Sequence, residues 1–110
     1  MTLTSAEPDT VSVASDIVQE RSLVTPLPGP RSQELMAHKS AAVASGVGTT
    51  MAVFAARAGG GIVVDVDGNH FIDLGAGIAV TTVGASAPRV VEAVRRQVEQ
   101  FTHTCFVVTP

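Results

Sequence analysis

Three aspartates, Asp65, Asp67 and Asp73, lie close together in the middle of the chain and could ligate a cation. The twelve-residue ligand pattern of a calcium-binding loop and its terminal glutamate are absent, however. Asp67 precedes Gly68 and Asn69, a combination typical of a tight hairpin turn. The sequence therefore favours turn and strand-edge roles for these carboxylates over a metal site.

The histidines and the single cysteine form the second set of residues that could do chemistry. His103 and Cys105 are close in sequence, whereas His38 and His70 lie elsewhere. No pair has the Cys-x-x-Cys or His-x-x-x-His spacing typical of zinc sites, so no metal site is predicted. Cys105 has no identifiable base at a suitable separation, and the apolar residues after it predict burial rather than nucleophilic reactivity.

The stretch that must position these residues runs from Gly59 to Val80 and has the pattern of a β-hairpin followed by a glycine-rich return. Two runs rich in β-branched and aromatic residues flank the tripeptide Asp67-Gly68-Asn69. Gly68 can adopt the positive φ that such a turn requires. The pattern predicts two antiparallel strands joined at this tripeptide.

Further strand and turn signals surround the hairpin. The apolar run Val53 to Ala58 predicts a third strand, which would complete an antiparallel meander of about the minimum size for a stable sheet. The glycines at 59–61 are expected to form a loose joint that leaves the register poorly defined. Gly75 and Gly77 indicate either a plain loop or a point where the backbone bends sharply or approaches another group.

Residues 1–30 are expected to be a flexible extension followed by a proline-rich, extended lead-in. A helix is predicted over residues 32–45, because apolar residues recur there at helical spacing. Ser32 is expected to cap its start, and Gly46 to provide the left-handed residue after its end.

A second, strongly amphipathic helix is predicted over residues 87–101, with Pro88 in its first turn. Its valines and Phe101 fall on one face, so the helix must pack against something, which need not be part of this chain. Arg89 and Arg96 are each expected to reach an acidic residue three positions further along.

The bulk properties limit the class of protein. A chain of 110 residues is long enough for one small domain. The formal net charge of −3 argues against nucleic-acid binding, which needs clustered basic residues. A single cysteine indicates a reducing, cytoplasmic setting. No stretch has the roughly 18 apolar residues of a membrane span, and the N-terminus lacks the pattern of a secretion signal.

Four motifs follow one another after Gly46, namely D-V-D-G-N-H-F-I-D-L, G-I-A-V, a Gly-x-x-x-Pro helix entry and H-T-C-F. With them, the segment from Gly46 to Pro110 resembles the N-terminal part of the class III aminotransferases, and most closely their bacterial 4-aminobutyrate branch. Two positions depart from that pattern. Residues 85–87 are Ala-Ser-Ala where many members carry histidines, and Val107 stands where some carry glutamine.

The resemblance implies a parent protein with the α/β fold type I of pyridoxal-phosphate enzymes, forming a homodimer or higher homo-oligomer. Residues 31–110 would be its N-terminal segment, truncated before the large cofactor-binding domain. This segment would comprise the N-terminal helix, the small antiparallel β-meander and the amphipathic helix.

The resemblance also implies which residues bind ligands. Ile78, in G-I-A-V, matches an isoleucine that lines the substrate channel of the family, although it could instead be an ordinary core residue. Lys39 is the only lysine in the chain and does not match the position of the family's catalytic lysine. The resemblance thus implies no catalytic and no cofactor-binding residue within these 110 residues, and a chain that is inactive alone.

The implied reaction of the parent enzyme uses pyridoxal 5'-phosphate and small amino acid and 2-oxo acid substrates. The amino group of 4-aminobutyrate would pass through the cofactor to 2-oxoglutarate, yielding succinate semialdehyde and glutamate. Two alternatives stay open. One is another ω-amino acid enzyme of the ornithine or acetylornithine type, and the other is a non-catalytic domain that binds a partner.

Overall fold

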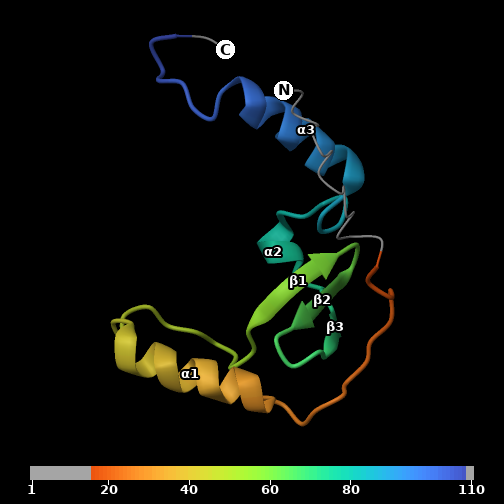
Figure 1. Ribbon diagram of the computed structural model, residues 1–110, viewed down its shortest axis with the longest axis vertical. Coiled ribbons are helices and arrows are strands. Elements are labelled where there is room, and N and C mark those ends of the chain that lie inside the picture. Colours follow the sequence, from red (N-terminus) through yellow and green to blue (C-terminus); the bar gives the residue numbers. More distant parts are fainter. Residues whose placement is uncertain (1–15, 109–110) are drawn as a thin grey trace, which may run out of the picture.

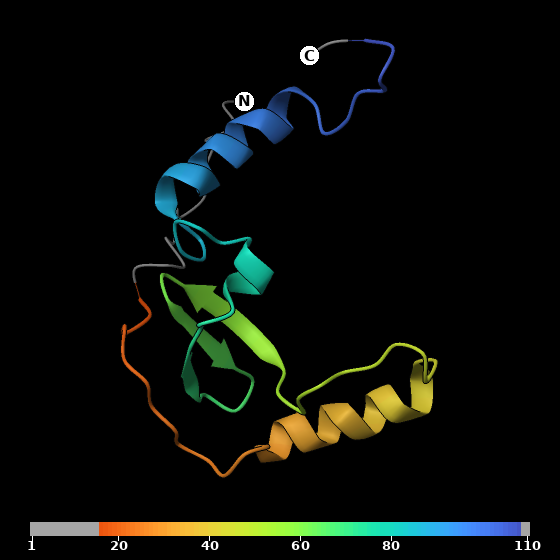
Figure 2. The same cartoon turned by 180° about the vertical axis from the view of Figure 1, so that it is seen from behind.

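A computed structural model describes residues 16–108, in which a small sheet lies between two helices that extend from its opposite ends (Figures 1 and 2). The elements, in chain order, are α1 (Pro30–Ala42), β1 (Ala55–Gly59), β2 (Ile62–Asp65), β3 (His70–Ile72), α2 (Ala76–Ala79) and α3 (Pro88–Gln100). The Cα radius of gyration is 18.3 Å, against about 13 Å for a compact chain of this length. The helices therefore do not fold back onto the sheet.

The sheet is the predicted antiparallel meander, in the order β1-β2-β3. Strands β1 and β2 pair with a register shift between Ala55 and Arg57, and Gly59 faces Ile62 across a two-residue turn in which Gly60 has a φ of 58°. The prediction of a loose glycine joint is therefore wrong. The Gln19 side chain fixes this turn, because its Nε2 donates to the Gly59 carbonyl and its Oε1 accepts from the Gly61 N–H, both at 3.0 Å.

The lead-in closes one edge of the sheet. Ser22 and His70 exchange two backbone hydrogen bonds, so the segment around Ser22 lies against β3. Ile17 is buried and forms the core with Ile62 and Val64. Within the range 1–30, which the sequence predicts to be flexible, residues from Ile17 onward thus contact the sheet, and residues 1–15 lie outside the described part.

Helix α1 begins and ends earlier than predicted. It starts at Pro30, with Gly29 in the N-cap position, and Ser32 lies inside the helix and is fully buried. The predicted Ser32 cap is wrong because an aspartate from the hairpin takes its place, as described below. The helix ends at Ala42, and Val43 is already extended, so the predicted left-handed residue at Gly46 does not form the end.

Helix α3 confirms the predicted amphipathic helix with Pro88 in its first turn, and it is one residue shorter at each end than the predicted range 87–101. Its apolar stripe is exposed, with Val90, Val94 and Val98 each about half accessible. The predicted pairing of Arg96 with a later acid is not what the structure has, since Arg96 Nε lies 4.0 Å from Glu92 Oε1, one turn earlier. No helix among residues 16–108 combines the length and the apolar character needed to cross a membrane.

Candidate functional site

The three aspartates that could have held a cation all accept hydrogen bonds from backbone N–H groups. Asp65 is buried, and its Oδ1 accepts hydrogen bonds from the N–H groups of Asp67 (2.9 Å) and Asn69 (2.8 Å). Gly68 has a φ of 87°, as predicted for the turn. Asp73 accepts from the two N–H groups that open α2. The predicted turn and strand-edge roles are confirmed for Asp65 and Asp73, whereas the carboxylate of Asp67 binds the start of α1.

Asn69 joins this hairpin turn to the lead-in. Its side chain is fully buried, and Oδ1 accepts from the N–H groups of Val24 (2.9 Å) and Thr25 (3.0 Å). Its Nδ2 donates to Thr25 Oγ1 (2.9 Å) and to Asp65 Oδ2 (2.8 Å). All four hydrogen-bonding positions of the amide are therefore used, and the turn and the lead-in form one unit.

Asp67 caps α1 from a distant position in the sequence. Its carboxylate accepts hydrogen bonds from the N–H groups of Arg31 (2.8 Å) and Ser32 (3.0 Å) and from the Ser32 hydroxyl (2.6 Å). Negative charge at a helix N-terminus is favourable, since the free N–H groups there point outward. Desolvation raises the pKa of Asp67, but the hydrogen bonds from Ser32 and Arg31, with the Arg31 charge, outweigh it and hold the pKa below its ordinary value of 3.8.

Gly29 makes room for this cap. A Cβ atom at Gly29 would overlap the Cβ, Cγ and Oδ2 atoms of Asp67. Because the carboxyl of Asp67 is held by three hydrogen bonds, it cannot move aside without losing them. The Pro28-Gly29-Pro30 sequence at the start of α1 therefore fits against the hairpin turn.

The remaining residues considered for metal or nucleophile chemistry do not converge. Among residues 16–108, no three or more His, Cys, Asp or Glu side chains are grouped so that they could hold a metal ion. The predicted burial of Cys105 is wrong: Cys105 is exposed, as are Phe106 (99%) and Val107 (71%). Within the described part of the chain, nothing packs over this apolar tail.

The residue expected to contact substrate, Ile78, lies on an unusual turn. The φ angles of Ala76, Gly77, Ile78 and Ala79 are 45°, 63°, 63° and 62°, so α2 is a short left-handed turn. Gly77 accounts for the predicted bend, but the left-handed alanines and isoleucine were not predicted. Such residues cost about 1–2 kcal/mol each relative to right-handed backbone. The Ile78 side chain is 95% exposed, so it is not a core residue of this segment.

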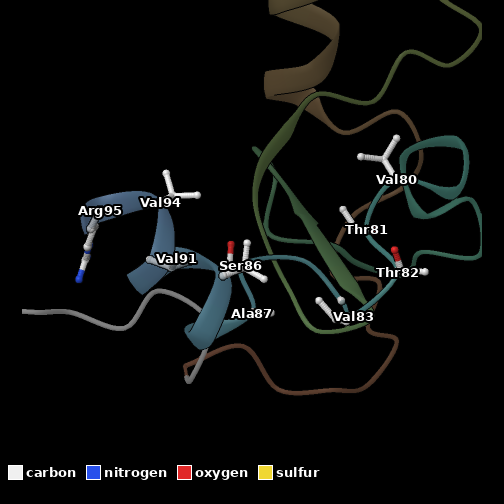
Figure 3. A pocket seen from close by; sticks show the side chains of 11 residues that line it. Val80, Thr81, Thr82, Val83, Ser86, Ala87, Val91, Val94 and Arg95 are labelled. Atoms are coloured by element: carbon white, nitrogen blue, oxygen red, sulfur yellow. The ribbon is translucent and has the colours of Figure 1, made fainter. Parts of the chain in front are cut away.

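A groove lies beside this turn, between residues 80–87 and α3 (Figure 3). It has a volume of about 540 Å³, and its lining is mostly apolar, with Val80, Val83 and Val91 among its residues and Arg95 at its α3 side. Ile78 does not line it. No sequence motif predicts this groove, and its only signal in the sequence is the valine stripe of the predicted helix.

Pyridoxal phosphate does not fit the described residues as a covalently held cofactor. Covalent attachment of this cofactor needs a lysine amine that is free to bond to the cofactor aldehyde. Lys39 is on α1, and its Nζ donates to the Val47 carbonyl at 2.7 Å, where it holds the chain that follows the helix.

Comparisons with known proteins bear on the identity of the chain. The family model described as aminotransferase class-III matches residues 42–110. The 4-aminobutyrate aminotransferase of Mycobacterium tuberculosis is 67% identical over 96 residues, which cover 87% of this chain and 21% of the relative. The Escherichia coli 4-aminobutyrate aminotransferase is 43% identical, over 69% of this chain and 18% of the relative.

A relative with a different activity matches the same segment. The alanine/serine racemase of Pyrococcus horikoshii is 37% identical, over 74% of this chain and 18% of the relative. The chain thus spans about a fifth of the length of the curated relatives it matches. Since the family model covers more than half of its residues, the chain belongs to the class III aminotransferase family.

Proposed function

We propose that this chain is the N-terminal segment of a 4-aminobutyrate:2-oxoglutarate aminotransferase. The whole protein would convert 4-aminobutyrate to succinate semialdehyde and pass the amino group to 2-oxoglutarate, which becomes glutamate. The observation that carries this proposal is the 67% identity to the mycobacterial enzyme over 96 residues. That value is far above the 37% identity to the racemase.

The cofactor of the whole enzyme is proposed to be pyridoxal 5'-phosphate, which supplies the electron sink that stabilises charge at the reacting carbon. The lysine that bonds to it, the carboxylate at its ring nitrogen and the donors to its phosphate are assigned to parts of the protein outside these 110 residues. This chain contributes no proton transfer of its own in the proposal.

The part assigned to this chain is one wall of the substrate channel. Ile78 is exposed on the left-handed turn, so its side chain is available to a ligand or to another segment. An apolar wall suits the bare methylenes of a linear ω-amino acid and excludes water from them. Ile78 would therefore discriminate between amino donors rather than take part in bond making.

Further proposals concern assembly and setting. We assign the whole enzyme to a homodimer or higher homo-oligomer in the cytoplasm. The exposed valine stripe of α3 and the exposed tail at 105–108 support an assembly that covers them, because monomers rarely leave extended apolar patches exposed.

An exchange chimera tests the function. In it, the aligned segment of this chain replaces its counterpart in the Mycobacterium tuberculosis relative. We expect the chimera to form succinate semialdehyde and glutamate from 4-aminobutyrate and 2-oxoglutarate, whereas this chain alone forms neither. Ornithine and acetylornithine serve as competing amino donors. A chimera that folds and takes up cofactor, yet prefers either of these donors, would refute the proposed substrate.

The role of Ile78 is tested by Ile78→Gln in the same chimera. A polar amide against methylenes lowers kcat/KM for 4-aminobutyrate, because it raises the free-energy barrier that this ratio measures by about 1–3 kcal/mol, the range for small changes in an apolar pocket. Cofactor content, followed by absorbance, is expected to stay unchanged. Unaltered kinetics with 4-aminobutyrate would remove Ile78 from the substrate channel.

A further inference from the structure

The carboxylate of Asp73 holds the entrance to the left-handed turn. Its Oδ1 accepts hydrogen bonds from the backbone N–H groups of Gly75 at 3.1 Å and Ala76 at 2.8 Å. Ala76 is the first of the left-handed residues, with a φ of 45°. Asp73 therefore stabilises the backbone at the point where it enters the left-handed conformation.

Asp73 is itself fixed to the sheet. It directly follows β3, and its N–H donates to the Gly61 carbonyl at 2.9 Å. The Gly61 N–H in turn donates to Gln19 Oε1 at 3.0 Å. The position of the turn is thus tied, through Asp73, to the tight turn between β1 and β2.

The backbone of the turn determines where Ile78 lies. The Gly75 carbonyl accepts from the N–H groups of Ile78 (2.7 Å) and Ala79 (3.1 Å). With 95% of the Ile78 side chain exposed, packing within this segment does little to hold it. A β-branched residue in the left-handed region is also an outlier that needs support from its surroundings. The hydrogen bonds of Asp73 provide such support.

We propose that Asp73 is a positioning residue, which sets the place of the Ile78 side chain in the substrate channel and thereby influences which length of amino donor the enzyme prefers. This inference rests on the proposed function, in which Ile78 forms one wall of that channel. Asp73 does not contact substrate in this proposal. It acts through the N–H groups of Gly75 and Ala76.

The exchange chimera provides the test, with the ratio of kcat/KM for 4-aminobutyrate to that for 5-aminovalerate, which is one methylene longer, as the readout. Asp73→Ala removes the acceptor and is expected to shift this ratio about 3- to 10-fold, mainly through KM. Asp73→Asn keeps an oxygen acceptor of the same shape and is expected to stay within about twofold of the parent. Cofactor absorbance reports whether each variant is loaded equally.

A double variant separates positioning from a general structural effect. If Asp73 acts through Ile78, Asp73→Ala has no further effect on the ratio once Ile78→Ala is present. An equal shift in both backgrounds overturns the proposal, and so does an unchanged ratio in Asp73→Ala when Ile78→Ala alone changes it. If Ile78→Ala itself leaves the ratio unchanged, the proposed channel wall fails and the inference fails with it.

A second variant covers the case in which Asp73→Ala does not accumulate as folded protein. Asp73→Glu keeps the charge but moves the carboxylate by one methylene, so it cannot meet both N–H groups in the same geometry. It is expected to shift the ratio in the same direction as Asp73→Ala. A folded Asp73→Glu chimera with the parent's ratio overturns the proposal.

Discussion

Replacing Asn69 by alanine is expected to release the lead-in from the sheet while the hairpin itself stays folded. The Asn69 amide is fully buried and holds the N–H groups of Val24 and Thr25. The Asp65 N–H donates to the Asn69 carbonyl and the Asn69 N–H donates to Asp65 Oδ1, and neither bond uses the Asn69 side chain. The loss should therefore be local to the residues that the amide binds.

The magnitude follows from the four hydrogen bonds that disappear. Three join neutral groups and contribute about 1 kcal/mol each, and the one to the Asp65 carboxylate contributes about 1.5–3 kcal/mol. Val24 is largely exposed, so water can restore part of this loss. We expect a net cost of about 2–4 kcal/mol, equivalent to roughly 30- to 1000-fold in the local opening equilibrium.

Amide hydrogen exchange reports this opening directly. It is measured for peptides that cover residues 20–29, in the chimera in which this segment replaces its counterpart in the Mycobacterium tuberculosis relative. Thr25→Val is a graded control, because it removes only the bond between Thr25 Oγ1 and Asn69 Nδ2 and should cost about 1 kcal/mol. Ser22→Ala leaves the backbone bridge to His70 intact and should change little. Protection in Asn69→Ala within about threefold of the parent would refute the reasoning.

Two further predictions concern the helices. Because the pKa of Asp67 is lowered in the folded chain, its ionised form stabilises the contact with α1 above the ordinary value of 3.8, and this contribution is lost as the pH falls through the folded pKa. Exchange at the Ser32 amide, corrected for its intrinsic pH dependence, should accelerate below about pH 4, whereas Asp67→Asn should abolish this dependence; an identical profile in both proteins would contradict it. The exposed stripe of α3 should make the isolated chain associate, and Val94→Lys with Val98→Glu should reduce that association in sedimentation experiments. A monodisperse parent chain with a sharp cooperative melt would contradict this second prediction.

The sequence predicts elements correctly where local chemistry decides them. Gly68 gives the turn the positive φ it needs, and the β-branched run before it and the segment with Phe71 and Ile72 after it form the strands as expected. Pro88 sets the start of α3 for an equally local reason. The N–H groups of the first turn have no acceptor within the helix, so a proline, which lacks an N–H, loses no hydrogen bond there. These features need no knowledge of distant residues.

The sequence fails where a distant residue decides the geometry. The start of α1 depends on Asp67, which lies 36 positions beyond Arg31, and no local pattern connects them. The tight glycine turn at 59–61 depends on Gln19, from a segment whose composition suggests flexibility. The left-handed turn at Ile78 contradicts the backbone preference of a β-branched residue, so a rule based on propensity cannot predict it.

The D-V-D-G-N motif is therefore recognisable for structural rather than catalytic reasons. Asp65 closes the turn, Asp67 caps α1 and Asn69 holds the lead-in, so each polar side chain of the motif has its hydrogen bonds within this segment. Residues with such structural roles are compatible with different reactions. A segment organised by them can match both aminotransferases and a racemase, as this one does. Among the exposed positions of this segment, Ile78 on its left-handed turn is the one that the proposed function assigns to substrate choice.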